Sequence, residues 1–273
     1  MDKRKILQQI ANTLYINVQQ AKQSGLLQGK LGIAIFFYHY ARYTGDESYN
    51  VFPNEYIEFL FNYLDKGKIE DFANGVSGIG WGFDYLTKNK FIETDDNILE
   101  DVDIAIEGLN PSDFEREFVL PIPLFSKGIY FLQRKNNDVL KETIPQIESF
   151  LQKNNPCQLP LMYVNSIFYV LTECVNCNID ADLCNYLLKK LQVESNYITK
   201  SETIDIEKIY INCLFDFIFS NSTYRLSDKA YLSYLSLNHV LIDLNYDNLS
   251  IYNGLAGIGL SIMLKDKCLD IQS

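Results

Sequence analysis

A segment that recurs about every 45 residues limits the possible folds of this 273-residue chain more than any other feature. Three strong copies read Gly, two residues, Gly, Ile and a small residue, at Gly29–Ala34, Gly75–Gly80 and Gly254–Gly259. Weaker copies between the second and third place a small residue at the second-glycine position, at Gly128, Ser166 and Cys213. Six copies in phase indicate a repeat protein.

The pattern of apolar residues in each repeat predicts two helices of different kinds. Segments that follow the glycines are apolar nearly all round, as in Ile33–Tyr40, which is typical of a buried helix. Segments between them carry a single apolar stripe, such as Leu140, Ile144, Ile147 and Leu151. The fold class predicted is all-α: an α/α toroid, or barrel, of about six outer/inner helix pairs that form one domain over residues 1–273. An open solenoid is the alternative, but its terminal repeats should be polar caps, and the last copy is among the most regular.

Composition and charge exclude several classes of partner. The chain has 24 Lys and Arg against 35 Asp and Glu, a net charge of −11, which argues against nucleic-acid and anionic-membrane binding. The first residues place apolar side chains at helical spacing, as at Ile6, Ile10 and Leu14, which is unlike a secretory signal. No window is apolar enough for a membrane span. We therefore expect a cytoplasmic protein whose cysteines are free thiols.

Parallel inner helices would place all their N-termini at one mouth of the toroid. Such ends carry unpaired N–H groups and a partial positive charge, which suit the carbonyl or carboxylate groups of a peptide. We expect Asn74 and Asn253 to be N-caps, and Trp81 and Tyr252 to line the bore. The candidate binding residues are Asn74, Gly75, Trp81, Asn212, Tyr252, Asn253 and Gly254. Close helix packing is the favoured explanation of the glycines, because it needs no ligand, and core packing could account for both aromatic residues.

The three strong repeats resemble those of the lanthionine synthetase C-like family. The similar segments are GLLQGKLGIAIFFYHYARYTGD, NGVSGIGWGFDYL and NGLAGIGLSIML, and the weaker repeats extend the resemblance over the whole chain. The resemblance implies an α/α toroid. In catalytic members it also implies the addition of cysteine thiols to dehydrated Ser or Thr of a precursor peptide. There, a zinc ion held by two Cys and one His activates the thiol.

The sequence departs from that family pattern where the zinc ligands should stand. The dipeptides before the glycines are Ala73-Asn74 and Tyr252-Asn253, which supply neither a thiolate nor an imidazole. His39 falls inside an apolar inner helix, His239 falls in a predicted outer helix, and no Cys precedes a Gly. We therefore predict no metal, no cofactor and no catalytic residue. The chain is interpreted as a degenerate family member, a peptide-binding or accessory factor in the maturation of ribosomal peptides. Its expected partners are a precursor peptide or a peptide-modifying enzyme.

Other functions stay open on the sequence alone. Paired carboxylates among Asp71, Asp84, Glu173 and Asp216 would favour a metal-independent enzyme acting on a glycan or peptide in the bore. A zinc-dependent cyclase with atypical ligands and a purely structural module are further alternatives. Cys174 and Cys177, with Cys184 seven residues on, could indicate metal or redox chemistry, although plain thiols in a helix–helix turn explain them as well. Cys213 fits as a small residue in a glycine position.

Overall fold

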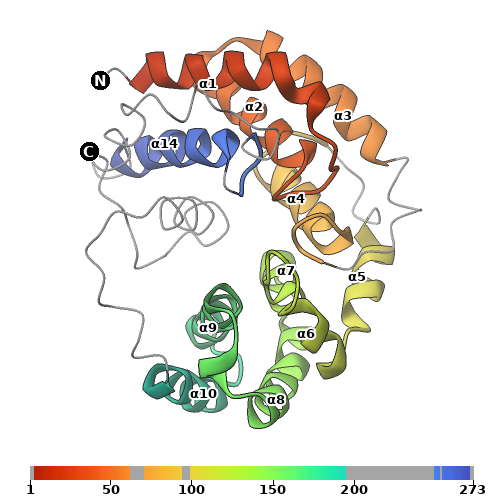
Figure 1. Ribbon diagram of the computed structural model, residues 1–273, viewed down its shortest axis with the longest axis vertical. Coiled ribbons are helices and arrows are strands. Elements are labelled where there is room, and N and C mark those ends of the chain that lie inside the picture. Colours follow the sequence, from red (N-terminus) through yellow and green to blue (C-terminus); the bar gives the residue numbers. More distant parts are fainter. Residues whose placement is uncertain (1–2, 62–70, 94–98, 195–248, 253, 271–273) are drawn as a thin grey trace. The chain divides into compact units, whose positions relative to one another are not determined.

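The computed structural model describes residues 3–61, 71–93, 99–194, 249–252 and 254–270. Every regular element in these ranges is a helix, which confirms the all-α prediction (Figure 1). The chain divides into two compact units, Met1–Gly67 with Glu202–Ser273 (unit 1) and Lys68–Ser201 (unit 2). Each unit is described by itself, and the single domain over residues 1–273 stays a prediction. None of the helices in the described ranges is long and apolar enough to cross a membrane.

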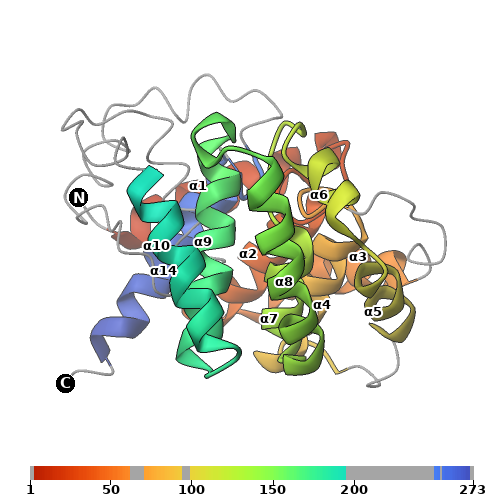
Figure 2. The same ribbon diagram turned by 90° about the horizontal axis from the view of Figure 1, so that it is seen from below.

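Unit 1 joins the first and last predicted repeats. Its helices are α1 (Lys3–Asn17), α2 (Lys30–Thr44), α3 (Val51–Phe61) and α14 (Leu255–Asp270), with the 3₁₀-helices η1 (Val18–Gln20) and η2 (Glu47–Asn50). Helix α14 packs against α1 and α2 (Figures 1 and 2). The Tyr252 N–H also donates to the Leu27 carbonyl at 2.8 Å. Neighbouring first and last repeats argue against an open solenoid, and closure of the whole ring stays a prediction.

The second glycine of the motif is needed because a backbone carbonyl lies against the helix. A Cβ on Gly32 would stand 2.3 Å from the Leu26 carbonyl oxygen, and one on Gly257 would stand 2.2 Å from that of Ile251. In both repeats the carbonyl belongs to the sixth residue before the glycine. The segment that precedes each helix thus packs its backbone directly on the first turns, where any side chain would clash. This geometry supports the packing interpretation of the repeated glycines.

Unit 2 contains the middle repeats. Its helices are α4 (Val76–Lys88), α5 (Glu100–Glu107), α6 (Pro111–Glu117), α7 (Ser126–Arg134), α8 (Asn137–Lys153), α9 (Leu161–Asn176) and α10 (Ala181–Glu194), with the 3₁₀-helix η5 (Pro156–Gln158). Figure 2 shows α7, α8, α9 and α10 side by side, and successive members of this group pack against each other. The predicted stripe of α8 is confirmed, since its four apolar residues are buried.

The two kinds of helix differ in burial as the sequence predicts. We call α2, α4, α7, α9 and α14, which begin at the repeated motif, the motif helices. In α2 every residue from Leu31 to Ala41 is buried, and in α4 every residue from Ser77 to Asp84. One outer helix is interrupted: α5 ends at Glu107, with Gly108 as its C-cap, and α6 begins at Pro111. The side chain of Asn110 caps α6 in a capping box, with a proline at the first helical position.

Candidate functional site

The start of α4 carries two of the candidate residues, and it corrects one prediction. The N-cap residue is Gly75, with φ −97° and ψ −170°, and it has no side chain to cap the helix. The expected N-cap, Asn74, instead donates its backbone N–H to Oδ1 of Asp71 at 2.8 Å. Gly75 donates its own N–H to the Asp71 carbonyl at 3.0 Å. The N-cap prediction for Asn74 is therefore wrong, because Asp71 organises this turn and shifts the helix start by one residue.

The motif helices have one feature in common at their starts, which is the residue composition of the first turn. Helix α2 also begins at a glycine N-cap, Gly29, without a capping side chain. None of the five described motif helices has an acidic residue in its first turn. The partial positive charge of these N-termini is thus not neutralised by carboxylates of the helix itself.

The start of α14 carries the candidates of unit 1. Tyr252 is half-buried, its backbone N–H is held by Leu27, and its carbonyl accepts a hydrogen bond from Ser250 Oγ at 3.3 Å. Gly254 is buried and its carbonyl accepts from the Ile258 N–H at 3.3 Å. Asn253 and Asn212, and with them His239 and Cys213, lie outside the described residues. Because Tyr252 and Gly254 belong to unit 1, while Asn74, Gly75 and Trp81 belong to unit 2, a single shared site stays a prediction.

Trp81 lies in the interior of unit 2. Its side chain is 3% exposed. The indole stacks on Tyr85 with ring centroids 5.2 Å apart, and the ring of Phe72 lies edge-on to it at 6.0 Å. Such contacts are typical of a core aromatic residue. They favour the core-packing alternative over direct contact with a ligand.

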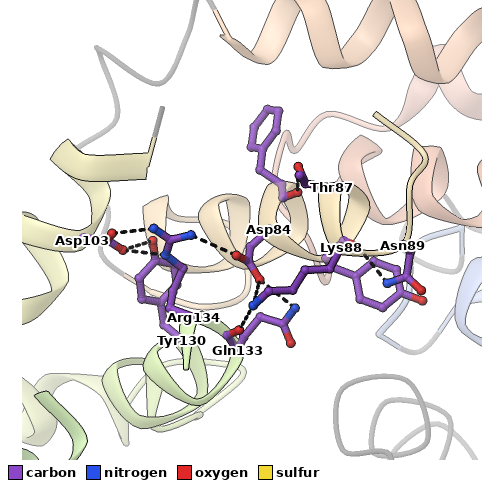
Figure 3. Close-up of polar contacts among 10 residues, drawn as sticks. Asp84, Thr87, Lys88, Asn89, Asp103, Tyr130, Gln133 and Arg134 are labelled. Atoms are coloured by element: carbon purple, nitrogen blue, oxygen red, sulfur yellow. Dashed lines mark hydrogen bonds and ion pairs between the residues drawn. The ribbon is translucent and has the colours of Figure 1, made fainter. Parts of the chain in front are cut away.

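Asp84, one of the candidate acids, is the centre of a saturated ionic network (Figure 3). This carboxylate is 5% exposed and lies on α4. It pairs with Lys88 Nζ at 2.7 Å and with Arg134 Nη1 at 3.0 Å, and it accepts from Gln133 Nε2 at 2.9 Å. Three partners on two oxygens leave this group paired and hydrogen-bonded, as buried carboxylates generally must be. It is therefore poorly placed to move a proton.

The same network extends from α4 through α7 to α5. Arg134 binds Asp103 with two parallel hydrogen bonds, from Nε at 3.0 Å and from Nη2 at 2.8 Å. Tyr130 donates its hydroxyl to Oδ1 of Asp103 at 2.7 Å, and Lys88 also donates to the Gln133 carbonyl. The bond to Asp103 is the main cause that raises the pKa of Arg134. This two-pronged geometry fixes three helices of unit 2 and is structural in character.

Glu117 is a buried acid that the sequence reasoning missed. It ends α6, is 6% exposed, and accepts the Ser126 N–H at the start of α7 at 3.3 Å. Its second oxygen lies 3.2 Å from the Tyr163 hydroxyl, which lies equally far from the Phe114 carbonyl. Burial raises the pKa of Glu117 to about 8. A protonated Glu117 can donate to Tyr163 while Tyr163 donates to Phe114, so that every group is satisfied.

A buried lysine, Lys127, follows Ser126, the residue whose N–H Glu117 accepts. Lys127 Nζ donates to the carbonyls of Glu107 and Leu109, both at 2.7 Å, at the C-terminal end of α5. It thereby satisfies carbonyls that the helix leaves without an intrahelical partner. Burial lowers the pKa of Lys127. Lys127 joins the start of α7 to the end of α5, and Glu117 joins the end of α6 to the start of α7. We assign both residues a structural role.

The remaining candidates from the sequence are also placed. His39 is buried within α2 as predicted. Cys174 and Cys184 are buried free thiols, whereas Cys157 and Cys177 are exposed. The exposed Asn176 amide donates to Glu173 Oε1 at 3.3 Å. In the part of the chain that the structure describes, no three His, Cys, Asp or Glu side chains converge where they could hold a metal ion.

Comparison with known proteins identifies the family. A family model described as "Lanthionine synthetase C-like protein" matches residues 20–169. No curated protein and no solved structure matches the chain. The matched segment is more than half of the 273 residues and includes α2, α4 and α7. This chain therefore belongs to the lanthionine synthetase C-like family.

Proposed function

We propose that this protein is a non-catalytic member of its family that binds a precursor peptide or assists a peptide-modifying enzyme. The observation that carries this proposal is the pair of dipeptides at the motif glycines, Ala73-Asn74 and Tyr252-Asn253. Family resemblance implies zinc ligands at such positions, and none of these four side chains offers a thiolate or an imidazole. Family membership together with this substitution favours retained peptide binding without the metal-dependent chemistry.

The starts of the motif helices support a peptide as the ligand. Their first turns carry no acidic residue in the described part of the chain, and α2 and α4 have glycine N-caps. A peptide supplies carbonyl oxygens and carboxylates, which helix N-termini attract through N–H groups and the helix dipole. Asn74, beside the N-cap of α4, is the candidate residue closest to such a group.

The metal-independent enzyme is less favoured by the acids that are described. Asp84 is paired with Lys88 and Arg134, and Asp71 holds the turn before α4. Catalysis by a carboxylate pair requires one acid that can donate a proton and one that can accept it. Neither Asp71 nor Asp84 is arranged for that role. Asp216 lies outside the described residues.

Peptide titration tests the proposal directly. Fluorescence anisotropy of labelled candidate precursor peptides should report saturable binding to the full chain. Asn74→Asp adds a negative charge beside the N-cap of α4 and should weaken binding of an acidic or carbonyl-rich peptide several-fold. Asn136→Asp is the matched control, because Asn136 caps the intervening helix α8. Equal losses in both variants would contradict a role for the motif-helix start, and a uniform failure of peptides to bind would contradict the proposal itself.

Metal analysis separates the proposal from the zinc-dependent alternative. Protein purified without chelators and without a histidine tag should contain far less than one zinc ion per chain. Near-stoichiometric zinc, accompanied by thioether formation in a precursor peptide, would overturn the non-catalytic assignment and support a cyclase with atypical ligands.

A further inference from the structure

Two buried cysteines face each other across the turn that joins α9 to α10. Cys174 lies in the last turn of α9, and Cys184 lies in the first turns of α10. Both side chains are 0% exposed. The two helices pack closely against each other in unit 2. The cysteines thus lie at the end of the α9–α10 hairpin that carries the turn, and both are buried there.

One residue of the turn is hydrogen-bonded to both cysteines. The Ile179 N–H donates to the Cys174 carbonyl at 2.8 Å, and Cys184 Sγ donates to the Ile179 carbonyl at 3.5 Å. Asn178 and Asp180, on either side of Ile179, have φ values of 56° and 42°. These left-handed conformations produce a tight turn, and asparagine and aspartate tolerate them better than most residues. The backbone of the hairpin therefore holds residues 174 and 184 close together.

The two thiols also interact directly. A hydrogen bond between them raises the pKa of Cys174 and lowers that of Cys184. The exposed Cys177 lies at the C-cap of α9 and contributes a smaller electrostatic effect on Cys174. Although three thiols share this hairpin, they do not converge as ligands of a metal ion among the described residues. The arrangement fits redox chemistry of a dithiol better than metal binding.

We propose that Cys174 and Cys184 form an intramolecular disulfide that joins α9 to α10, with a low-molecular-weight disulfide as the oxidant. The Cys184 thiolate attacks one sulfur of the oxidant and releases one small thiol, which leaves a mixed disulfide on the protein. Cys174 then loses its proton and attacks Cys184 Sγ, which releases the second small thiol. The protein loses two electrons and two protons, and the oxidant is reduced to two thiols.

Burial sets the rate of this reaction. Because both sulfur atoms are inaccessible to solvent, the oxidant reaches them only when the hairpin opens locally. We expect oxidation to be slow in buffer and to accelerate several-fold in urea concentrations below the unfolding transition. The exposed Cys157 and Cys177 should instead react at once and form mixed disulfides with the oxidant.

Peptide mapping of the full chain tests the pairing. The protein is incubated with oxidised glutathione, its free thiols are blocked with N-ethylmaleimide in concentrated urea, and it is digested after Glu and Asp. Cleavage after Glu173, Asp180 and Asp182 separates Cys184 from a peptide that holds Cys174 and Cys177. The expected product links these two peptides through Cys174 and carries maleimide or glutathione on Cys177.

Controls decide between this disulfide and its rivals. Cys177→Ala should leave the cross-linked product unchanged, whereas Cys184→Ala should abolish it. A disulfide between Cys174 and Cys177, or maleimide on both Cys174 and Cys184 after prolonged oxidation, would overturn the proposal. If Cys184→Ala lowers stability, the wild-type map still decides the pairing. A second readout is the melting temperature. It should rise when the disulfide forms and return to its initial value after reduction, because the bond joins α9 to α10. An unchanged melting temperature in protein shown to be cross-linked would contradict a disulfide that fits the native hairpin.

Discussion

Replacing Glu117 by Gln should make the protein more stable near neutral pH. Glu117 is buried between the end of α6 and the start of α7, next to the Tyr163 hydroxyl. Glutamine keeps the shape of the side chain, can still accept the Ser126 N–H, and can donate its amide to Tyr163. It cannot ionise. The variant therefore removes the cost of a charge at this position and leaves the packing intact.

The sign and size of the effect follow from proton linkage. The pKa of Glu117 is raised from 4.5 to about 8, so the folded state holds this proton more tightly than the unfolded state. Stability from this group is complete below pH 4.5 and is lost as the pH rises toward 8. Between pH 5 and pH 7 the loss amounts to about 2.5 kcal/mol of unfolding free energy. Glu117→Gln should not show this loss.

Urea unfolding at pH 5, 6 and 7 measures the effect as a difference between variants. Because other carboxylates titrate in both proteins, only the difference between wild type and Glu117→Gln isolates this proton. Glu115→Gln is the matched control, since it removes the same charge from an exposed position on α6. The difference should grow steadily with pH for the first variant and stay near zero for the second. Parallel curves for wild type and Glu117→Gln would refute a buried, protonated Glu117.

Three further predictions concern packing, ion pairing and burial. Gly257→Ala should lower the unfolding free energy by about 2 kcal/mol, because its Cβ would meet the Ile251 carbonyl at 2.2 Å. Gly108→Ala is the control: its Cβ would lie 3.6 Å from the nearest atoms, so the unfolding free energy should change by less than about 0.5 kcal/mol. Equal effects of the two substitutions in thermal melts would contradict the close contact at Gly257. Arg134→Met should cost about 3 kcal/mol in urea unfolding, because Asp103 loses the partner that binds it with two hydrogen bonds and the buried Asp84 loses one of its cations. A neutral result would show that the network adds little. The single tryptophan, Trp81, should emit at short wavelength and resist iodide, and quenching like that of free indole would refute its burial.

The helices and their burial could be predicted from the sequence because they depend on local periodicity. The all-round apolar segment beginning at Ile33 became the buried helix α2, and the stripe beginning at Leu140 became α8. The contact of the last repeat with the first agrees with the sequence, where the last copy of the motif is among the most regular and does not look like a polar cap. Gly108 and Pro111 mark the break between α5 and α6, but the apolar stripe from Leu99 to Leu109 runs past the end of α5 and hides it.

The polar interior could not be predicted because it depends on contacts between repeats. Glu117 stands in a charged run that is typical of a solvated helix face, yet it is buried against Tyr163 and the start of α7. Its spacing offered one signal: Glu117 lies three residues after Phe114, on the same helical face as that buried ring. Asn74 was misplaced as an N-cap for a local reason. The carboxylate three residues earlier, Asp71, takes the backbone N–H that defines the turn.

The surroundings of the second glycine show which part of the motif serves packing and which positions are left for function. In two repeats the second glycine admits the carbonyl of the sixth residue before it, at Leu26 and at Ile251, and a ligand is not required to explain either. In these two repeats the motif therefore encodes packing of the connecting segment on its helix. Any function must depend on positions that the motif leaves variable, above all the residue before the first glycine, where this chain has Asn74. If so, substitutions of the glycines should lower stability and peptide binding together, whereas Asn74→Asp should lower binding alone.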